Sequence, residues 1–176
     1  MNKADLKKAI RNIPDFPKPG ILFRDITTLL SDQDAFKYAV DALCDEFKGK
    51  SIDTVVAVEA RGFILGGAIA YKLGVGFVPV RKKGKLPWKT KSVTYALEYG
   101  TDTLQIHEDA LKPGARVLII DDLLATGGTV KAVTELVEAQ GAIVEGIGFV
   151  IDLVDLGGRA KLNNYNVVSL VEFKGL

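Results

Sequence analysis

The hydrophobic residues of the chain fall into short strand-sized runs separated by amphipathic stretches. Strand-sized apolar runs lie at residues 54–58, 76–80, 117–120 and 167–171, and an alternating run lies at 143–153. Runs of this kind, rich in β-branched residues, are typical of strands buried on both faces of a parallel sheet. Apolar residues recur at helical spacing over residues 4–12, 31–47, 63–71, 130–138 and 156–162. The pattern predicts a single α/β domain over residues 1–176, with a mostly parallel central sheet and helices on both faces.

Size, composition and charge narrow the classes of protein to consider. The chain has 176 residues, 48% of them hydrophobic and 26% charged, and a net charge of +1. This composition is ordinary for one globular domain, and the charge gives no electrostatic footprint for nucleic acid or a membrane surface. Because the N-terminus lacks an apolar h-region and the apolar runs are strand-sized, we expect no signal peptide, no transmembrane helix and a cytoplasmic location. We therefore expect small-molecule partners, and neither nucleic acid nor membrane.

The most informative stretch follows the apolar run at 117–120. Two adjacent carboxylates end this run, and small residues then precede an amphipathic helix; these residues are Asp121, Asp122, Ala125, Thr126, Gly127, Gly128 and Thr129. Backbone N–H groups at a helix start form an anion cradle, and adjacent carboxylates persist best where a cation, ligand hydroxyls or N–H donors compensate them. This predicts a sugar phosphate with its hydroxyls on Asp121 or Asp122 and Mg²⁺ nearby. Successive strand side chains point to opposite faces, which leaves open which carboxylate reaches the ligand or the metal.

Two common phosphate-binding motifs are missing from the chain. It has no G-x-x-x-x-G-K-S/T loop and no G-x-G-x-x-G after a predicted strand. Signatures of P-loop ATPases and of dinucleotide-binding enzymes are therefore absent.

A second predicted strand also ends in a candidate binding loop. Glu59, Ala60, Arg61 and Gly62 follow the strand at 54–58. An arginine is thereby placed at the carboxyl end of a strand, where open α/β sheets bind ligands. The alternative for Arg61 is a surface salt bridge.

The stretch at 117–129 resembles the signature for 5-phosphoribosyl 1-pyrophosphate (PRPP) in the type I phosphoribosyltransferases. Its form, D-D-L-L-A-T-G-G-T, is similar to that of the members that act on adenine, and the resemblance extends from residue 13 to about residue 173. The resemblance implies the type I phosphoribosyltransferase fold, with a small hood at about residues 1–30 and a flexible lid at about 82–106. It also implies transfer of phosphoribose from PRPP to adenine in purine salvage, forming AMP and pyrophosphate, with Mg²⁺ as cofactor and a homodimer as the assembly.

The same resemblance assigns roles within the two loops and the basic run that follows residue 80. The residues that would bind the phosphate and ribose of PRPP are Asp121, Asp122, Ala125, Thr126, Gly127, Gly128 and Thr129, and the metal would contact Asp121 and Asp122 directly or indirectly. The residues that would hold pyrophosphate are Ala60, Arg61, Arg81, Lys82 and Lys85. A non-proline cis peptide bond is expected in the loop 59–62.

The segment at 13–25 is a second region with two interpretations. Three prolines among residues 13–20 exclude a helix and force an extended, turn-rich path. From the residues alone this is an N-terminal arm that packs on the core. The resemblance implies instead a hood that receives adenine, in which Phe23 stacks on the purine and the main chain of Leu22 and Arg24 reads its edge. Leu153 would contact the opposite purine face, although the sequence fits a plain core role for it equally well.

The basic run at 81–91 contains no acid, and residues 93–99 and 103–107 read as a hairpin turned at 100–102. We interpret this region as a mobile cationic flap over a polyanion. Displacement of pyrophosphate passes through an oxocarbenium-like centre that water would also attack, so the site has to close before reaction.

The candidate catalytic residues, again by resemblance, are Arg61, Glu98 and Tyr99. Glu98 would handle the ring proton of the purine, and its alternative role is an exposed strand glutamate. Tyr99 would either order the closed lid or approach the ribose. The only histidine, His107, falls in a strand expected to be exposed, and we assign it no function.

Two rival functions share parts of this pattern. A transferase for hypoxanthine, guanine or xanthine would have the same signature but different hydrogen-bond partners in the hood. A non-catalytic sensor of PRPP would keep the fold, but such proteins usually carry a separate DNA-binding segment.

Overall fold

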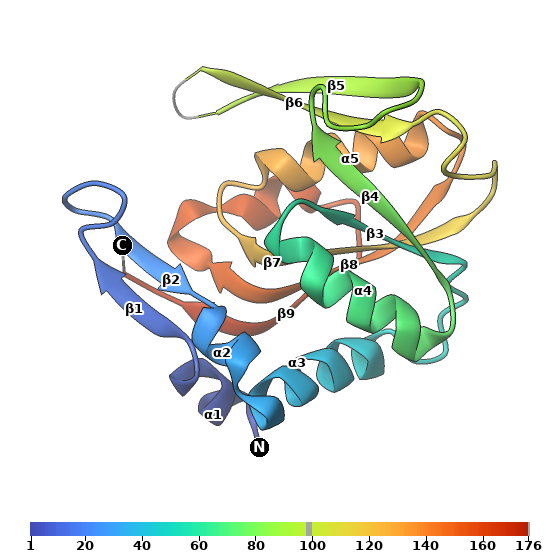
Figure 1. The fold of residues 1–176 in the computed structure, drawn as a ribbon. Helices are drawn as coiled ribbons and strands as arrows, with labels where there is room; N and C mark the ends of the chain where they lie inside the picture. The colour runs from blue at the N-terminus through green and yellow to red at the C-terminus, as the bar shows by residue number, and fades with distance from the viewer. Residues whose placement is uncertain (98–99, 176) are drawn as a thin grey trace.

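The predicted alternation of strands and helices is present in the computed structural model, which describes residues 1–97 and 100–175 (Figure 1). Its helices are α1 (Lys3–Lys8), α2 (Thr27–Ser31), α3 (Gln33–Glu46), α4 (Arg61–Leu73) and α5 (Gly128–Glu138), with the short 3-10 segments η1 (Val154–Leu156) and η2 (Gly158–Leu162). Its strands are β1 (Arg11–Pro14), β2 (Leu22–Asp25), β3 (Thr54–Val58), β4 (Gly76–Lys82), β5 (Thr90–Ala96), β6 (Thr101–His107), β7 (Arg116–Leu124), β8 (Ile143–Leu153) and β9 (Val167–Phe173). None of these helices is long and apolar enough to cross a membrane.

Seven strands form the central sheet in the order β5-β6-β4-β3-β7-β8-β9. The strands β4, β3, β7, β8 and β9 pair in parallel, and the β5–β6 hairpin joins β4 by antiparallel pairing. The mostly parallel α/β fold is thus confirmed. A separate antiparallel ribbon of β1 and β2 stands beside the end of β9, where the Arg24 guanidinium lies 4.2 Å from the centre of the Phe173 ring (Figure 1).

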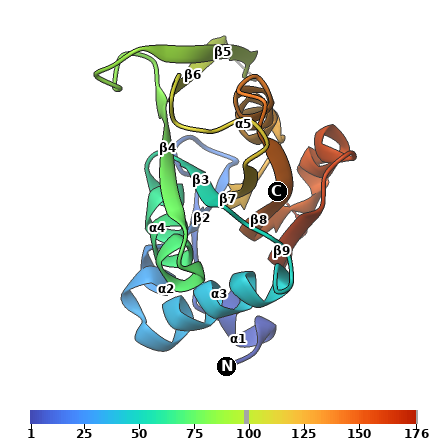
Figure 2. The same ribbon diagram turned by 90° about the vertical axis from the view of Figure 1, so that its right-hand side faces the viewer.

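Alternation along β7 builds one hydrophobic core on each face of the sheet. Leu118 and Ile120 pack with residues of α3 and α4, whereas Val117 and Ile119 pack with residues of α5. Successive strand side chains point to opposite faces, so an uninterrupted apolar run serves both cores. Figure 2 shows α4 and α5 on opposite sides of the sheet.

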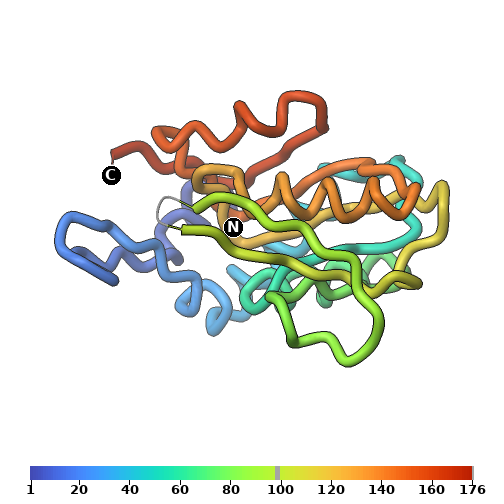
Figure 3. Tube along the Cα trace, turned by 90° about the horizontal axis from the view of Figure 1, so that it is seen from above, coloured from blue at the N-terminus to red at the C-terminus, as the bar shows by residue number. Residues whose placement is uncertain are grey.

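The β5–β6 hairpin confirms the prediction of two antiparallel strands in the lid region. Its register runs from Thr90 opposite His107 to Ala96 opposite Thr101. Seen from above, the hairpin passes over the sheet edge and lies alongside α5 (Figure 3). The expectation that β6 is exposed is wrong in part, because Leu104 and Ile106 are buried in the core shared with α5.

Three other local predictions are corrected by the structure. The first helix ends at Lys8, because Arg11–Pro14 pairs with Leu22–Asp25 as a strand. The short helix α2 was not predicted. A helix was expected over 156–162, but the chain forms two 3-10 segments separated by Gly157. Gly157 has a φ of +66°, which does not occur in a right-handed helix.

Phe47 provides a test of how the helical layer is fixed to the sheet. It follows α3, is 2% exposed, and its ring fills the space that Gly146 and Gly148 leave on β8. We expect Phe47→Ala to lower the free energy of unfolding by about 3–5 kcal/mol, because it leaves a cavity in the core. Urea denaturation measures this, with Ile143→Ala as the control, since Ile143 is 50% exposed. A loss below about 1 kcal/mol for Phe47→Ala would contradict this packing.

Candidate functional site

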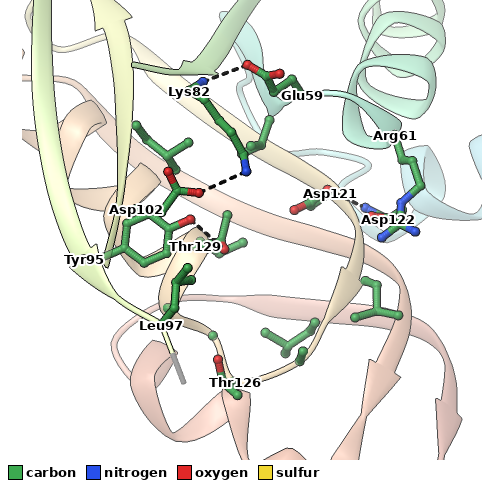
Figure 4. Close-up of a pocket in the computed structure, with 18 of the residues that line it drawn as sticks. Glu59, Arg61, Lys82, Tyr95, Leu97, Asp102, Asp121, Asp122, Thr126 and Thr129 are labelled. Atoms are coloured by element: carbon green, nitrogen blue, oxygen red, sulfur yellow. Dashed lines mark hydrogen bonds and ion pairs between the residues drawn. The ribbon is translucent and has the colours of Figure 1, made fainter. Parts of the chain in front are cut away.

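A cavity of about 380 Å³ opens at the carboxyl ends of β3 and β7 (Figure 4). The loop between β7 and α5 forms its floor, the start of α4 forms one wall, and the β5–β6 hairpin covers it. The predicted residues that line it are Ala60, Arg61, Lys82, Asp121, Asp122, Ala125, Thr126, Gly127, Gly128 and Thr129. Residues predicted from two separate loops and from the lid therefore meet in one place.

The loop before α5 has the features of an anion cradle. Gly127 adopts a left-handed φ of +78° as the N-cap of α5, and no side chain caps this helix end. The first turn of α5 also contains no acidic residue. Its N-terminal N–H groups are therefore left for a ligand, and the helix dipole favours a negative one.

Asp121 and Asp122 are directed to different sides of the cavity wall, as alternation along β7 requires (Figure 4). The Oδ1 atom of Asp121 accepts a hydrogen bond of 2.9 Å from the backbone N–H of Asp122. Asp122 is 4% exposed and turns toward Arg61, whose Nε lies 2.8 Å from its Oδ2. That contact lacks hydrogen-bond alignment, so Oδ2 has no hydrogen-bond partner.

Burial of these two like charges changes their protonation. Burial raises the pKa of Asp121 well above its ordinary value, and the neighbouring charge of Asp122 raises it further. Burial also raises the pKa of Asp122, although the nearby Arg61 charge opposes this effect. The pair therefore favours a ligand that supplies positive charge or hydroxyl donors.

Arg61 is placed by the abrupt start of α4 after β3. The Glu59–Ala60 peptide bond is cis, as predicted, and α4 begins at Arg61. Gly62 allows α4 to approach β7, because a Cβ there would lie 2.8 Å from Asp121 Oδ1 and 3.3 Å from the Ile120 carbonyl oxygen. This role of Gly62 was not predicted, because it depends on the contact of α4 with β7, which lies far along the chain.

Glu59 pairs with the basic residues at the base of the lid. Its carboxylate accepts hydrogen bonds of 2.7 Å from the Lys82 backbone N–H and from Lys85 Nζ, and Arg81 Nε lies 3.4 Å away. Burial by itself raises the pKa of Glu59, but the bonds from Lys85 and Lys82 outweigh it and leave the pKa below its ordinary value. Arg81 and Lys85 therefore pair with a protein carboxylate, a role that the sequence analysis missed.

The hairpin touches the anion cradle directly. The Tyr95 hydroxyl lies 3.2 Å from Thr129 Oγ1, and Lys82 Nζ lies 3.1 Å from Asp102 Oδ2 across the cavity (Figure 4). The hydrogen bond to Asp102 raises the pKa of Lys82, so this amine stays charged. Tyr95 and Asp102 were not predicted. Glu98 and Tyr99 lie outside the residues that the structure describes.

The ribbon of β1 and β2 approaches the site through Phe23, which lies beside Arg61, although none of the predicted adenine-binding residues lines the cavity itself. The Phe23 ring packs edge-on against Phe16, with centroids 5.1 Å apart, and the Arg61 guanidinium lies 5.5 Å from its centre. Arg61 thus stands between Phe23 and Asp122. Leu22 lies next to Phe23 in β2, and Leu153 ends β8, which pairs with β7.

The Arg24 side chain points away from the cavity. It is 6% exposed, donates a hydrogen bond to Asn12 Oδ1 and lies over Phe173. Burial lowers the pKa of Arg24. Its side chain therefore ties the ribbon to β9, which leaves its main chain for any role in the site.

Asp121 and Asp122, the acid pair of the site, allow a stability test that needs no ligand. An unfolded aspartate has a pKa of about 4, and burial raises the pKa of Asp121 above this in the folded protein. The folded protein therefore binds more protons than the unfolded chain, so its stability falls as the pH rises above about 4. We expect Asp121→Asn to raise the melting temperature at pH 7 and to have little effect below pH 4. Differential scanning calorimetry at the two pH values measures this. A lower melting temperature of the variant at pH 7 would contradict the inferred charge repulsion.

Comparison with known proteins agrees with this geometry. Residues 28–173 match the model of the phosphoribosyl transferase domain. A protein named adenine phosphoribosyltransferase from Methylobacterium nodulans is 62% identical over 172 residues, which are 97% of this chain and 95% of that protein.

Solved structures give the same result. Adenine phosphoribosyltransferase from Thermoanaerobacter pseudethanolicus has a TM-score of 0.95 and 53% identity, covering 98% of this chain and all of that one. The enzyme from Saccharomyces cerevisiae, solved with D-2,5-dideoxy-2,5-imino-altritol 1,6-bisphosphate and adenine, has a TM-score of 0.91 and 42% identity, covering 96% and 98% of the two chains. The chain therefore belongs to the phosphoribosyl transferase family.

Proposed function

We propose that the protein transfers phosphoribose from PRPP to adenine, forming AMP and pyrophosphate in purine salvage. The observation that carries the proposal is the position of Arg61, whose guanidinium lies 2.8 Å from Asp122 and 5.5 Å from the centre of Phe23. One residue thus connects the acid pair, which suits a ribose, with an aromatic ring, which suits a purine. The names of the close relatives and the adenine bound in the yeast enzyme support the same substrates.

In this proposal the cradle binds the 5-phosphate of PRPP. The N–H groups at the start of α5 and the hydroxyls of Thr126 and Thr129 donate hydrogen bonds to it, with Ala125, Gly127 and Gly128 allowing close approach of the backbone. Asp121 and Asp122 accept hydrogen bonds from the ribose hydroxyls. The ligand thereby compensates two shielded carboxylates whose pKa values burial raises, and it relieves the effect of the Asp122 charge on Asp121.

The same carboxylates suit Mg²⁺. The residues that the structure describes contain no group of three or more candidate protein ligands for a metal. Mg²⁺ is usually bound by one or two carboxylates together with substrate phosphates, and the adjacent carboxylates of Asp121 and Asp122 on the cavity wall fit such a role. When bound with PRPP, the ion would neutralise charge on the leaving pyrophosphate. Asp121 and Asp122 would hold it directly or through water and ribose hydroxyls.

Pyrophosphate would be held at the opposite wall. Ala60 offers its backbone at the start of α4, Arg61 offers a guanidinium, and Lys82 places a charged amine in the cavity. Arg81 and Lys85 join them if pyrophosphate displaces Glu59 as their partner. The arrangement places positive charge where negative charge develops as the bond to ribose breaks.

The hood and the lid complete the site in this proposal. Phe23 stacks on adenine, the main chain of Leu22 and Arg24 reads the purine edge, and Leu153 contacts the other face. The lid at about 82–106 closes over the reacting ribose and excludes water. Glu98 would handle the ring proton of adenine, and Tyr99 would either order the closed lid or approach the ribose.

We further propose a cytoplasmic homodimer. The outer face of α4 carries two exposed apolar side chains, Ile64 and Tyr71, which are 46% and 91% exposed and lie seven residues apart on one side of the helix. A second copy of the chain would cover them. Sedimentation velocity tests the assembly, and a monomer at micromolar concentration would contradict it.

Substitutions in the acid pair and the cradle test the phosphoribosyl site. We expect Asp122→Asn and Thr126→Ala each to lower kcat/KM for PRPP by at least about a hundredfold, because each removes a group assigned to the reacting sugar or its phosphate. Circular dichroism should show the wild-type fold in both. The control is Asp109→Asn, on an exposed loop. Wild-type turnover by Asp122→Asn would remove the acid pair from the mechanism.

The choice of base tests the hood. The protein is given PRPP and Mg²⁺ with adenine, hypoxanthine or guanine separately, and pyrophosphate release is followed. A base with a carbonyl in place of the amino group leaves buried hydrogen-bonding groups unpaired, which costs roughly 1–3 kcal/mol for each. We therefore expect adenine to be preferred by at least about a hundredfold. Preference for another base would refute the hood assignment, and binding without turnover on any base would indicate the sensor.

A further inference from the structure

The turn between η1 and η2 packs directly on the loop that forms the anion cradle. A Cβ on Gly158 would overlap the Ala125 carbonyl oxygen and would lie 3.0 Å from the Gly127 nitrogen. A Cβ on Gly127 would in turn lie 2.5 Å from the Gly158 carbonyl oxygen. The two backbones are thus in contact at both glycines, and neither loop can shift toward the other. Such proximity is possible only where both residues lack a side chain.

Arg159 fixes this turn to the end of the sheet. Its Nε donates a hydrogen bond of 2.5 Å to Asp152, and its two terminal nitrogens donate to the Val167 carbonyl at 3.1 Å and to Ser169 Oγ at 2.5 Å. Asp152 is 1% exposed, so loss of this partner would leave a buried carboxylate without its counter-charge. A planar guanidinium that bonds three groups on β8 and β9 holds the turn more rigidly than a single ion pair would.

We propose that Gly158 is a positioning residue for the phosphate cradle, and that Arg159 holds it in place on β8 and β9. The cradle works through backbone N–H groups, whose direction depends on the path of residues 125–127. No side chain caps α5, and Gly127 itself has a left-handed conformation, so the path needs support from outside the loop. The Gly158 backbone supplies that support by steric contact. The inference rests on the proposed function in taking a sugar phosphate as the ligand of the cradle.

The proposal predicts a loss that is confined to phosphate binding. In Gly158→Ala the new methyl group pushes residues 125–127 out of line, so the N–H groups no longer converge on the phosphate. We expect the Kd for ribose 5-phosphate and the KM for PRPP to rise at least tenfold. The kcat at saturating PRPP and the KM for adenine should stay within threefold of wild type. A general structural defect would instead lower kcat and the melting temperature and raise both KM values together.

The experiment measures ribose 5-phosphate binding by isothermal titration calorimetry, alongside initial rates and melting temperature. Gly157→Ala is the matched control, because its Cβ would meet no atom within 4 Å. Its left-handed φ of +66° makes the substitution strained, so the melting temperature should fall while Kd and KM stay within twofold of wild type. Arg159→Lys is the second variant, since a lysine keeps a charge beside Asp152 but loses the planar fork. We expect it to weaken ribose 5-phosphate binding about threefold.

The outcomes separate the possibilities. A folded Gly158→Ala protein that binds ribose 5-phosphate as tightly as wild type would overturn the proposal. If Gly158→Ala does not fold, Arg159→Lys decides. Weaker ribose 5-phosphate binding with an unchanged KM for adenine supports the role of the turn, whatever the melting temperature. Unchanged ribose 5-phosphate binding, or an equal loss of affinity for both substrates, overturns it. Wild-type protein that binds ribose 5-phosphate but has no turnover with PRPP and adenine would refute the proposed function alone, because the comparison of binding between variants would still stand.

Discussion

Two adjacent carboxylates at the end of a buried strand are the constraint on which the site depends. Water would solvate such a pair at low cost, but the end of β7 is largely shielded by α4 and by the loop before α5. Each charge raises the free energy of the other, and burial adds to this cost. In the described structure Arg61 and the Asp122 backbone N–H compensate the pair only partly. A ligand with hydroxyls and a divalent cation would compensate the negative charge that remains.

The surrounding elements bring compensating groups to this point from three directions. The start of α4 brings Arg61 to Asp122, the start of α5 brings uncapped N–H groups, and the end of β4 brings Lys82. The ribbon of β1 and β2 adds Phe23 against Arg61. A site that collects unpaired charge and uncapped helix ends gives up stability for binding, which is a common compromise at functional sites.

The central sheet could be predicted from the sequence because its signal is local. The runs at 55–58 and 117–120 are apolar without interruption, short and rich in β-branched residues, which is typical of strands covered on both faces. The candidate residues of the cradle and the acid pair were also predicted, since each motif is contiguous and directly follows a strand. The structure then brings them together with Arg61 and Lys82 in one cavity. Their roles in binding and catalysis remain proposals.

Features that depend on distant partners could not be predicted in the same way. Glu59 pairs with Lys85, 26 positions later, and Gly158 meets Ala125 across a separate part of the chain. No periodicity reports such contacts. A helix was predicted over 156–162 because apolar spacing is similar in α-helices and 3-10 segments, but the left-handed conformation of Gly157 interrupts it. The position of the Arg24 side chain could not be predicted either, because it depends on stacking against Phe173, which lies far along the chain.

The most direct test of this account is the titration of the acid pair itself. Carboxyl carbon NMR of selectively labelled protein can follow Asp121 and Asp122 from pH 3 to pH 8, with and without PRPP and Mg²⁺. The account predicts that the higher apparent pKa of the free pair lies clearly above the ordinary value of about 4, and that ligand and metal lower it. If both carboxylates titrate at or below about 4 in the free protein, burial and charge repulsion do not destabilise the ionised pair, and the site does not depend on them.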